Sequence, residues 1–255
     1  MKKQYIYLLL AIISLCCIDS IYSQKKEYKP EDTEVWSPEP AIVTPGKESH
    51  LPPSDAIVLF DGSNTNAWKH QQSDTVKWSV SNGAITVVPK AGQIISRQKF
   101  GSCQLHLEFK MPVEDDKTGQ GRGNSGVFFM GRYEVQILNN YNNKTYVNGQ
   151  CASVYKESPP LVNACRPSEE WQTYDIVFTA PVFNKKGKVE KPAYVTVFHN
   201  GVLVQDNLPI AKRGPGCQAK NICEPNPLML QDHSGFPGAP DTTMKFRNIW
   251  LRKLD

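Results

Sequence analysis

The feature that most constrains the fold is a series of short, strand-like segments separated by turn signals. The clearest segment runs over residues 103–111, where Leu105, Leu107 and Phe109 alternate with polar residues. A period of two places the apolar side chains on one face of a strand and the polar ones on the other. No stretch after residue 55 shows a sustained helical period, so the pattern predicts an all-β protein.

Two Asn-Gly dipeptides predict tight hairpins, because this pair accepts the positive φ angles of a two-residue turn. Asn82-Gly83 separates apolar segments at 78–80 and 84–87, and Asn200-Gly201 separates 194–198 from 202–205. Further strands are expected at 57–60, 127–130, 133–138, 174–179, 228–231 and 246–251. Many short strands with frequent turns predict a sandwich or jelly roll.

The N-terminus predicts a secretory signal peptide over residues 1–23. Lys2 and Lys3 precede an apolar run at 7–18, and Ser23 is a small residue before the expected cleavage point. The run is shorter than the roughly 20 residues of a membrane-spanning helix. The protein is therefore expected to be exported to the periplasm or cell surface, and Cys16 and Cys17 leave a lipid anchor open.

The rest of the chain divides into two parts. Residues 24–54 are rich in Lys, Glu and Pro and predict a flexible N-terminal segment, although its last part could lie over the domain that follows. Residues 55–255 suit one large β domain. The formal net charge is +4, with basic residues scattered along the chain, so nucleic acid is not an expected partner.

Cysteine spacing suggests two disulfides in an oxidising compartment. The candidate pairs are Cys217 with Cys223 and Cys151 with Cys165, and Cys103 is expected to be a buried free thiol. Zinc binding is the rival interpretation. It is disfavoured because no C-x-x-C or H-x-x-x-H spacing accompanies these cysteines.

The segment 133–138 carries the strongest candidate site. Glu134 and Gln136 share one face of the expected strand, and a carboxylate beside an amide suits hydrogen bonds to sugar hydroxyls or acid–base chemistry. Tyr133 precedes them. The glycine-rich run 121–126 is expected to form the rim of the same pocket, with Arg122 and Asn124 as polar contacts.

Two further groups are candidates. His106 and Glu108 share the polar face of the strand at 103–111, where a solvated sheet face is an equal alternative. Gln231, Asp232 and His233 follow an apolar strand, and an Asp beside a His can supply a base or a metal ligand. Carboxylates and histidines on a concave face could also hold a divalent cation, which the sequence does not identify.

Several of these segments, taken together and in order over about residues 56–255, resemble the 3-keto-disaccharide hydrolase domain family. They are Leu59-Phe60-Asp61-Gly62 with Trp68, Gly123-Asn124-Ser125-Gly126-Val127, Tyr133-Glu134-Val135-Gln136-Ile137-Leu138, Trp171-Gln172-Thr173-Tyr174-Asp175-Ile176, His199-Asn200-Gly201-Val202, Leu230-Gln231-Asp232-His233 and Phe246-Arg247-Asn248-Ile249-Trp250. The resemblance implies a concanavalin A-like jelly roll of two curved antiparallel sheets. It also implies bacterial export and action on glycosides oxidised at carbon 3.

The implied reaction begins with removal of the carbon-2 proton, which the neighbouring ketone acidifies, and continues with expulsion of the group at carbon 1 and hydration. Glu134 or His233 would be the base, Arg122 or a cation would stabilise the oxyanion, and Glu108, Gln136 and Asn124 would orient the sugar. His106, Tyr133, Gln231 and Asp232 complete the expected substrate contacts.

Two alternatives stay open. The chain is also similar to family 16 glycoside hydrolases, whose catalytic strand carries carboxylates spaced like Glu134 and Gln136. The amide at the second position departs from their two-carboxylate mechanism, so a conventional glucanase is one alternative. A non-catalytic carbohydrate-binding module of the same fold is the other, since fold does not decide function.

Overall fold

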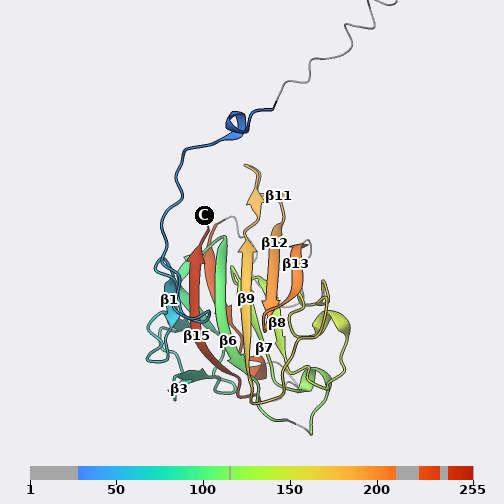
Figure 1. Ribbon diagram of the computed structural model, residues 1–255. Coiled ribbons are helices and arrows are strands. Elements are labelled where there is room, and N and C mark those ends of the chain that lie inside the picture. Colours follow the sequence, from blue (N-terminus) through green and yellow to red (C-terminus); the bar gives the residue numbers. More distant parts are fainter. Residues whose placement is uncertain (1–27, 115, 211–223, 236–240, 255) are drawn as a thin grey trace, which may run out of the picture. The chain divides into compact units, whose positions relative to one another are not determined.

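The computed structural model describes residues 28–114, 116–210, 224–235 and 241–254 (Figure 1). The chain divides into two units, Met1–Ile42 and Val43–Asp255. Within the first, residues 28–42 contain one 3₁₀ turn, η1 (Pro30–Thr33). None of the helices in the described ranges is long and hydrophobic enough to cross a membrane.

The second unit contains two large antiparallel sheets (Figure 1). One follows the order β13-β12-β9-β6-β15-β4-β3, with β1 also paired to β15, and the other follows β2-β5-β14-β7-β8. The eight strands of the first sheet are β1 (Ile57–Phe60), β3 (Ser79–Ser81), β4 (Ala84–Thr86), β6 (Cys103–Lys110), β9 (Trp171–Thr179), β12 (Ala193–His199), β13 (Val202–Ile210) and β15 (Lys245–Lys253). The five strands of the second are β2 (Trp68–His70), β5 (Ile94–Phe100), β7 (Asn124–Phe129), β8 (Tyr133–Leu138) and β14 (Asn226–Leu230).

The remaining elements are short. Strands β10 (Val182–Phe183) and β11 (Val189–Lys191) pair only with each other, and three 3₁₀ turns lie in the loops: η2 (Gly119–Gly121), η3 (Val147–Gly149) and η4 (His233–Gly235). Residues 43–54 belong to the same unit as the sheets, where Nε1 of Trp250 donates a hydrogen bond to the carbonyl of His50 (3.0 Å).

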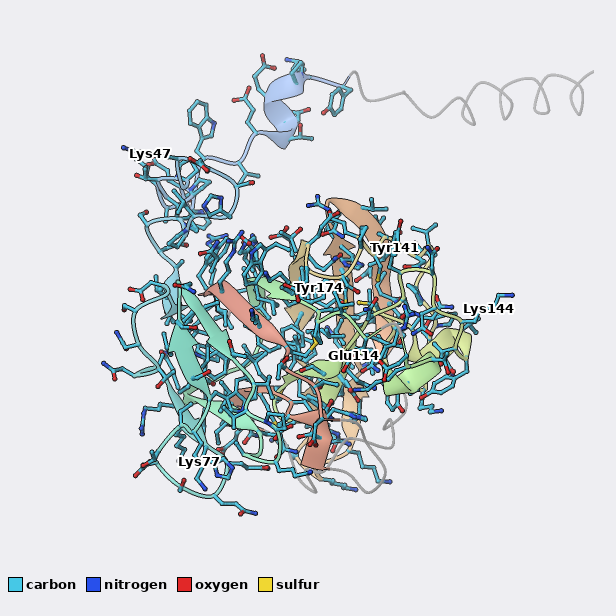
Figure 2. All side chains as sticks on the ribbon, turned by 90° about the horizontal axis from the view of Figure 1, so that it is seen from below. Lys47, Lys77, Glu114, Tyr141, Lys144 and Tyr174 are labelled. Atoms are coloured by element: carbon cyan, nitrogen blue, oxygen red, sulfur yellow. The ribbon has the colours of Figure 1, made fainter. Side chains whose placement is uncertain are left out.

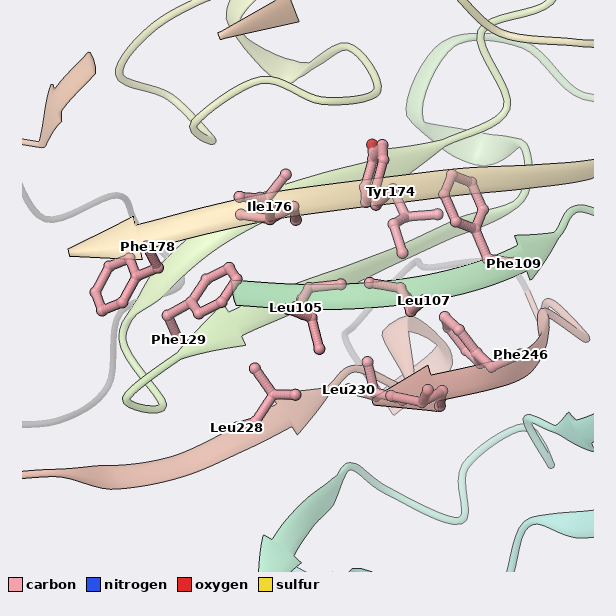
Figure 3. Close-up of a cluster of buried hydrophobic side chains, with 14 of the residues drawn as sticks. Leu105, Leu107, Phe109, Phe129, Tyr174, Ile176, Phe178, Leu228, Leu230 and Phe246 are labelled. Atoms are coloured by element: carbon pink, nitrogen blue, oxygen red, sulfur yellow. The ribbon is translucent and has the colours of Figure 1, made fainter. Parts of the chain in front are cut away.

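The hydrophobic core lies between the two sheets (Figure 3). Leu105, Leu107 and Phe109 of β6 point into it, as the alternation predicts. Phe129 of β7 stacks on Phe178 of β9 with ring centroids 4.7 Å apart, which joins one sheet to the other. Each fully buried Leu or Phe side chain contributes about 1.5–3 kcal/mol, so this layer is the main source of stability.

Both predicted Asn-Gly hairpins are confirmed. Asn82 and Gly83 connect β3 to β4 with φ angles of 50° and 71°, and Asn200 and Gly201 connect β12 to β13 with 53° and 80°. Positive φ at both central residues is what a type I′ turn requires.

Two strands of the second sheet, β2 and β5, were not predicted from the sequence. In β5 the residues Arg97, Gln98 and Lys99 are consecutively exposed, which hides the period-two signal. Strand β2 has only three residues, too few to show a period. Strand β7 begins at Asn124 rather than at Val127, so part of the expected glycine-rich rim is strand.

Candidate functional site

The face of the second sheet turned away from the core carries the polar candidates. On β8, Val135 and Ile137 belong to the core cluster, so Glu134 and Gln136 point to the opposite face. Gly126 pairs with Gln136, and Phe128 pairs with Glu134 across the β7–β8 ladder. We call the surface formed by Asn124, Gly126, Phe128, Glu134 and Gln136 the Glu134 face.

The Glu134 carboxylate lies directly over Gly126. A Cβ atom added at Gly126 would sit 2.7 Å from Oε1 of Glu134 and 2.9 Å from the Phe128 ring. The side chain is 6 % exposed. Burial raises the pKa of Glu134 from 4.5 to about 8, because a charged carboxylate loses hydration there.

Three side-chain amides extend this site. The Gln136 amide lies 3.3 Å from Oδ1 of Asn124 and 3.3 Å from Oε1 of Gln120. In the alternative orientation, with the Gln136 amide turned over, its nitrogen instead donates hydrogen bonds to Oε1 of Glu134 (3.2 Å) and to the carbonyl of Ser125 (2.9 Å). Gln120 is fixed in turn by hydrogen bonds to Oγ1 of Thr145 (3.0 Å) and the carbonyl of Gly149 (2.9 Å).

Residues 152–155 run alongside β8 and add Tyr155, which the sequence analysis missed together with its hydrogen-bond partner Tyr146. Val154 forms an antiparallel bridge with Val135, so Tyr155 shares a face with Glu134. Burial is the main cause that raises the pKa of the Tyr155 phenol, with its hydrogen bond to Tyr146 second (2.7 Å between hydroxyl oxygens). The Lys156 ammonium lies 3.3 Å from the centre of the Tyr146 ring.

The segment Gln231–His233 lies beside β7, next to the Glu134 face. The backbone N–H of Gln231 donates a hydrogen bond to the carbonyl of Gly126 (3.1 Å). The side chain of Gln231 is buried, and its Oε1 has no hydrogen-bond partner among the described residues. His233 lies on η4, which contacts β7, and burial lowers its pKa against the opposing effect of Asp232. At neutral pH the His233 imidazole is therefore uncharged.

Asp232 is a structural residue rather than a substrate contact. Its Oδ2 accepts a hydrogen bond from the backbone of Gly92 (2.9 Å), and its Oδ1 accepts from both the backbone (3.0 Å) and the hydroxyl of Ser234. Because both oxygens are engaged inside a fully buried turn, Asp232 positions the His233 segment.

A polar pocket of about 610 Å³ borders the Gln120 side of the site. Its lining residues are Asn140, Asn142, Asn143, Lys144, Thr145, Gln150 and Asn163. The side-chain amides of Asn140 and Asn143 form hydrogen bonds with backbone groups of their own loop, and Asn143 also donates to the carbonyl of Gly119 in η2. Lys144 extends outward from this loop (Figure 2). Thr145 connects the pocket to the Glu134 face through Gln120.

The structure separates Glu108 and His106 from this site. Both lie on β6 of the other sheet, on the face opposite the core. Glu108 accepts hydrogen bonds from Nε of Arg247 (2.6 Å) and Nδ2 of Asn248 (2.7 Å). The prediction that Glu108 acts on the sugar together with Glu134, by orienting it, is corrected, because the two carboxylates lie on opposite outer surfaces of the sandwich.

His106 has the same kind of structural environment. Its Nδ1 lies 2.7 Å from Oδ1 of Asp175, and its ring stacks on Trp250 with centroids 5.2 Å apart. The predicted substrate contact at His106 is corrected for the same reason as that of Glu108.

Tyr133 and Arg122 also point elsewhere. The Tyr133 ring packs 5.4 Å from Phe178 in the core, as expected for the strand neighbour of an outward-facing Glu134. Arg122 donates hydrogen bonds to the carbonyls of Lys117 (2.8 Å) and Tyr141 (3.1 Å), so it holds two loops together. Of the predicted contacts, Asn124, Gln136 and Gln231 are the ones that join Glu134.

The cysteines give a mixed outcome. Cys103 is buried, as predicted. Cys151 and Cys165 are close together but are free thiols in the structure, so the predicted disulfide between them is not formed there. Cys217 and Cys223 lie outside the described residues.

Among the described residues, no three His, Cys, Asp or Glu side chains of the Glu134 face lie close enough together to share an ion. Within the described ranges, the only three His, Cys, Asp or Glu side chains close enough to share an ion are Cys151, Cys165 and His199.

The close approach at Gly126 leads to a first prediction. Gly126→Ala should lower turnover of substrate at least tenfold, because the new methyl group displaces the Glu134 carboxylate or the Phe128 ring. Circular dichroism and thermal melting would check that the fold persists. A matched Gly121→Ala variant changes a glycine that has open space around it and no positive φ angle, so it tests the effect of substitution without displacing Glu134.

Comparisons with known proteins agree with this architecture. A crystal structure of a candidate glycosyl hydrolase from Parabacteroides distasonis matches with a TM-score of 0.81 and 42% identity, over 89% of this chain and 97% of that one. A second one from the same organism shares the fold at 18% identity, with a TM-score of 0.58 over 79% of this chain and 94% of that one. A search of functionally curated proteins gives no significant match.

The sequence resemblance and the fold are thus confirmed together. The 3-keto-alpha-glucoside-1,2-lyase-like domain matches residues 55–252, which covers both sheets and the whole Glu134 face. This chain therefore belongs to the 3-keto-alpha-glucoside-1,2-lyase-like domain family of carbohydrate-active proteins.

Proposed function

We propose that the protein is an exported enzyme that cleaves 3-keto-glycosides by elimination across carbons 2 and 1, followed by hydration. The observation that carries the proposal is the buried carboxylate of Glu134, whose pKa of about 8 suits a general base near neutral pH. It stands among amides and phenols, which suit a sugar.

In the proposed first step, Glu134 removes the proton at carbon 2. The electron pair of that C–H bond first forms a carbon 2–carbon 3 double bond and places negative charge on the carbon 3 oxygen, which gives the enolate. The enolate then returns to the ketone while the carbon 1–carbon 2 double bond forms and the bond from carbon 1 to the leaving oxygen breaks. The side-chain amides of Gln136 and Asn124 now donate hydrogen bonds to neighbouring protein acceptors, and in the proposed step they turn their N–H groups to the enolate oxygen as it forms. Water then adds at carbon 1, and carbon 2 recovers a proton.

The leaving oxygen needs a proton, and Tyr155 is the proposed donor. Its raised pKa keeps the phenol protonated at neutral pH, and Tyr146 can relay a proton from the more exposed side. The polar pocket beside Gln120 has the volume of a small-ligand site, and we place the leaving sugar there.

A two-carboxylate glycosidase mechanism has less support. The residue that shares the strand face with Glu134 is Gln136, and both oxygens of Asp232 are engaged by Gly92 and Ser234. A retaining enzyme needs a second free carboxyl group about 5–5.5 Å from the first.

The proposal is tested with 3-keto-trehalose and related 3-keto-glucosides, compared with the same sugars unoxidised. Release of glucose from the keto sugars only is the expected result. Release from the unoxidised sugars would establish a conventional glycosidase, and binding without release of either would establish a binding module.

The pH profile follows from the pKa of Glu134. Because the base is the ionised form, kcat/KM should rise about tenfold per pH unit below pH 8 and level off above it. Rates from pH 5 to 9.5 on a 3-keto-glucoside check this. A rate that falls as pH rises through 8 would instead make protonated Glu134 the active form.

Tyr155→Phe should lower kcat about 10²-fold, since the phenylalanine ring keeps the shape but cannot donate a proton. The loss should shrink for substrates with a more acidic leaving group, such as a nitrophenyl 3-keto-glucoside, which departs without protonation. An equal loss for both substrates would contradict the role of Tyr155 as the acid.

Export is the proposed location, supported by the signal peptide expected at residues 1–23. Fractionation of the source bacterium with an antibody to the folded domain tests it, and a cytoplasmic signal would contradict it.

A further inference from the structure

A second cluster of chemically reactive side chains lies in the core, behind the Glu134 face. Cys151 and Cys165 come from the loop between β8 and β9, and His199 ends β12. One ligand atom from each residue lies within 4.8 Å of the other two. We propose that Cys151, Cys165 and His199 form a structural zinc site.

The donor set matches zinc chemistry. Zn²⁺ is bound by thiolate sulfur at about 2.3 Å and imidazole nitrogen at about 2.0–2.1 Å, so neighbouring ligand atoms of a tetrahedral site lie about 3.5–3.8 Å apart. In the structure the three ligand atoms lie within 4.8 Å of one another. Small side-chain rotations that move these atoms by about 1 Å would bring them to the distances of a bound zinc ion.

Charge balance favours a divalent ion at this buried position. Cys151 is 3 % and His199 is 1 % exposed. Two thiolates offset the charge of Zn²⁺, and a neutral complex avoids leaving net charge in the core.

The surroundings also hold the ligands in place. Oε1 of Gln172 accepts hydrogen bonds from the backbone of Arg166 (2.9 Å) and Nδ2 of Asn200 (2.7 Å), and it lies 3.3 Å from Nε2 of His199. An acceptor already fixed by two donors orients the imidazole, as outer partners do at metal sites. The Tyr174 hydroxyl lies 3.0 Å from Sγ of Cys151 and adds a further polar contact to this cysteine.

A zinc ion at this site would fix the segment of residues 152–155 to the two sheets. Cys151 precedes Ala152, whose backbone donates to the carbonyl of Gln136 (2.9 Å), and the Tyr174 hydroxyl donates to the same carbonyl (2.7 Å). An ion here would therefore fix the segment that carries Tyr155 to β8 and to the first sheet. Sequence spacing hides the site, because His199 joins the cysteines only through the pairing of β12 with β9.

The test measures zinc in the full chain, purified under reducing conditions without chelator. Plasma mass spectrometry should find one zinc per chain, and Co²⁺ exchange should give intense thiolate-to-cobalt charge-transfer bands. Cys165→Ser and His199→Gln should each lose most of the metal, whereas Cys103→Ala, at the far end of the β6–β9 pair, should keep it.

Three results would overturn the proposal. They are wild-type protein with less than about 0.2 zinc per chain and no cobalt band, full zinc retained in Cys165→Ser, and a Cys151–Cys165 disulfide found by peptide mass spectrometry in metal-free protein. The first and third are read on the wild-type chain, so they hold even if a variant fails to fold. None depends on whether the enzyme acts on keto sugars.

Discussion

Replacing Glu134 with glutamine is expected to lower kcat on a 3-keto-glucoside by about 10²–10⁴-fold, the usual contribution of a general base. Glutamine has the same shape and can keep the contacts to Gln136 and Gly126, so substrate affinity should change little. Glucose release and calorimetric titration with the keto sugar measure the two quantities separately. Loss of binding together with turnover would point to a positioning role instead.

The same variant should be more stable than the wild type at alkaline pH. Because the pKa of Glu134 is about 8 in the folded protein and 4.5 as a free group, the unfolded chain loses this proton first as pH rises. The free energy of unfolding therefore falls between about pH 4.5 and 8, by at most about 5 kcal/mol. Glu134→Gln removes that slope, and melting curves at pH 5 and pH 8.5 compare the two proteins.

Removing Glu108 should lower the stability of the protein and leave its turnover unchanged. Glu108→Ala leaves Arg247 and Asn248 without their buried acceptor and should cost about 2–3 kcal/mol of stability. The value is below that of a fully buried pair because 37% of the Arg247 side chain is exposed. Turnover at a temperature where the variant stays folded should match the wild type.

Urea unfolding and initial rates, measured on the same preparation, check this prediction. Double substitution with Arg247→Ala should recover part of the lost stability, since no cation is then left unpaired. A folded Glu108→Ala protein that binds substrate but turns it over a hundredfold more slowly would place Glu108 in the reaction after all.

The sequence predicted the strands well where period two was clear, as in β6 and β8, and where Asn-Gly marked a turn. It also placed Glu134 and Gln136 on one face correctly, because alternation along a single strand decides this. It missed β5, where three consecutive exposed residues break the alternation.

The errors in the site have a common physical cause. Alternation groups residues within a strand but does not say which strands share a sheet, so His106 and Glu108 were grouped with Glu134 although β6 and β8 lie in different sheets. Tyr155 was missed because it joins the site through a single bridge between Val154 and Val135. The Cys151–Cys165–His199 cluster likewise depends on contacts between distant segments.

The most direct test of the central claim follows a 3-keto-glucoside carrying deuterium at carbon 2, in single turnover with enzyme in excess. If Glu134 removes that hydrogen, the wild type should release glucose with a primary isotope effect of several-fold. Glu134→Gln should bind the sugar without releasing it, and Glu108→Ala should behave as the wild type. Wild-type release with an isotope effect of one, unchanged in Glu134→Gln, would contradict the account.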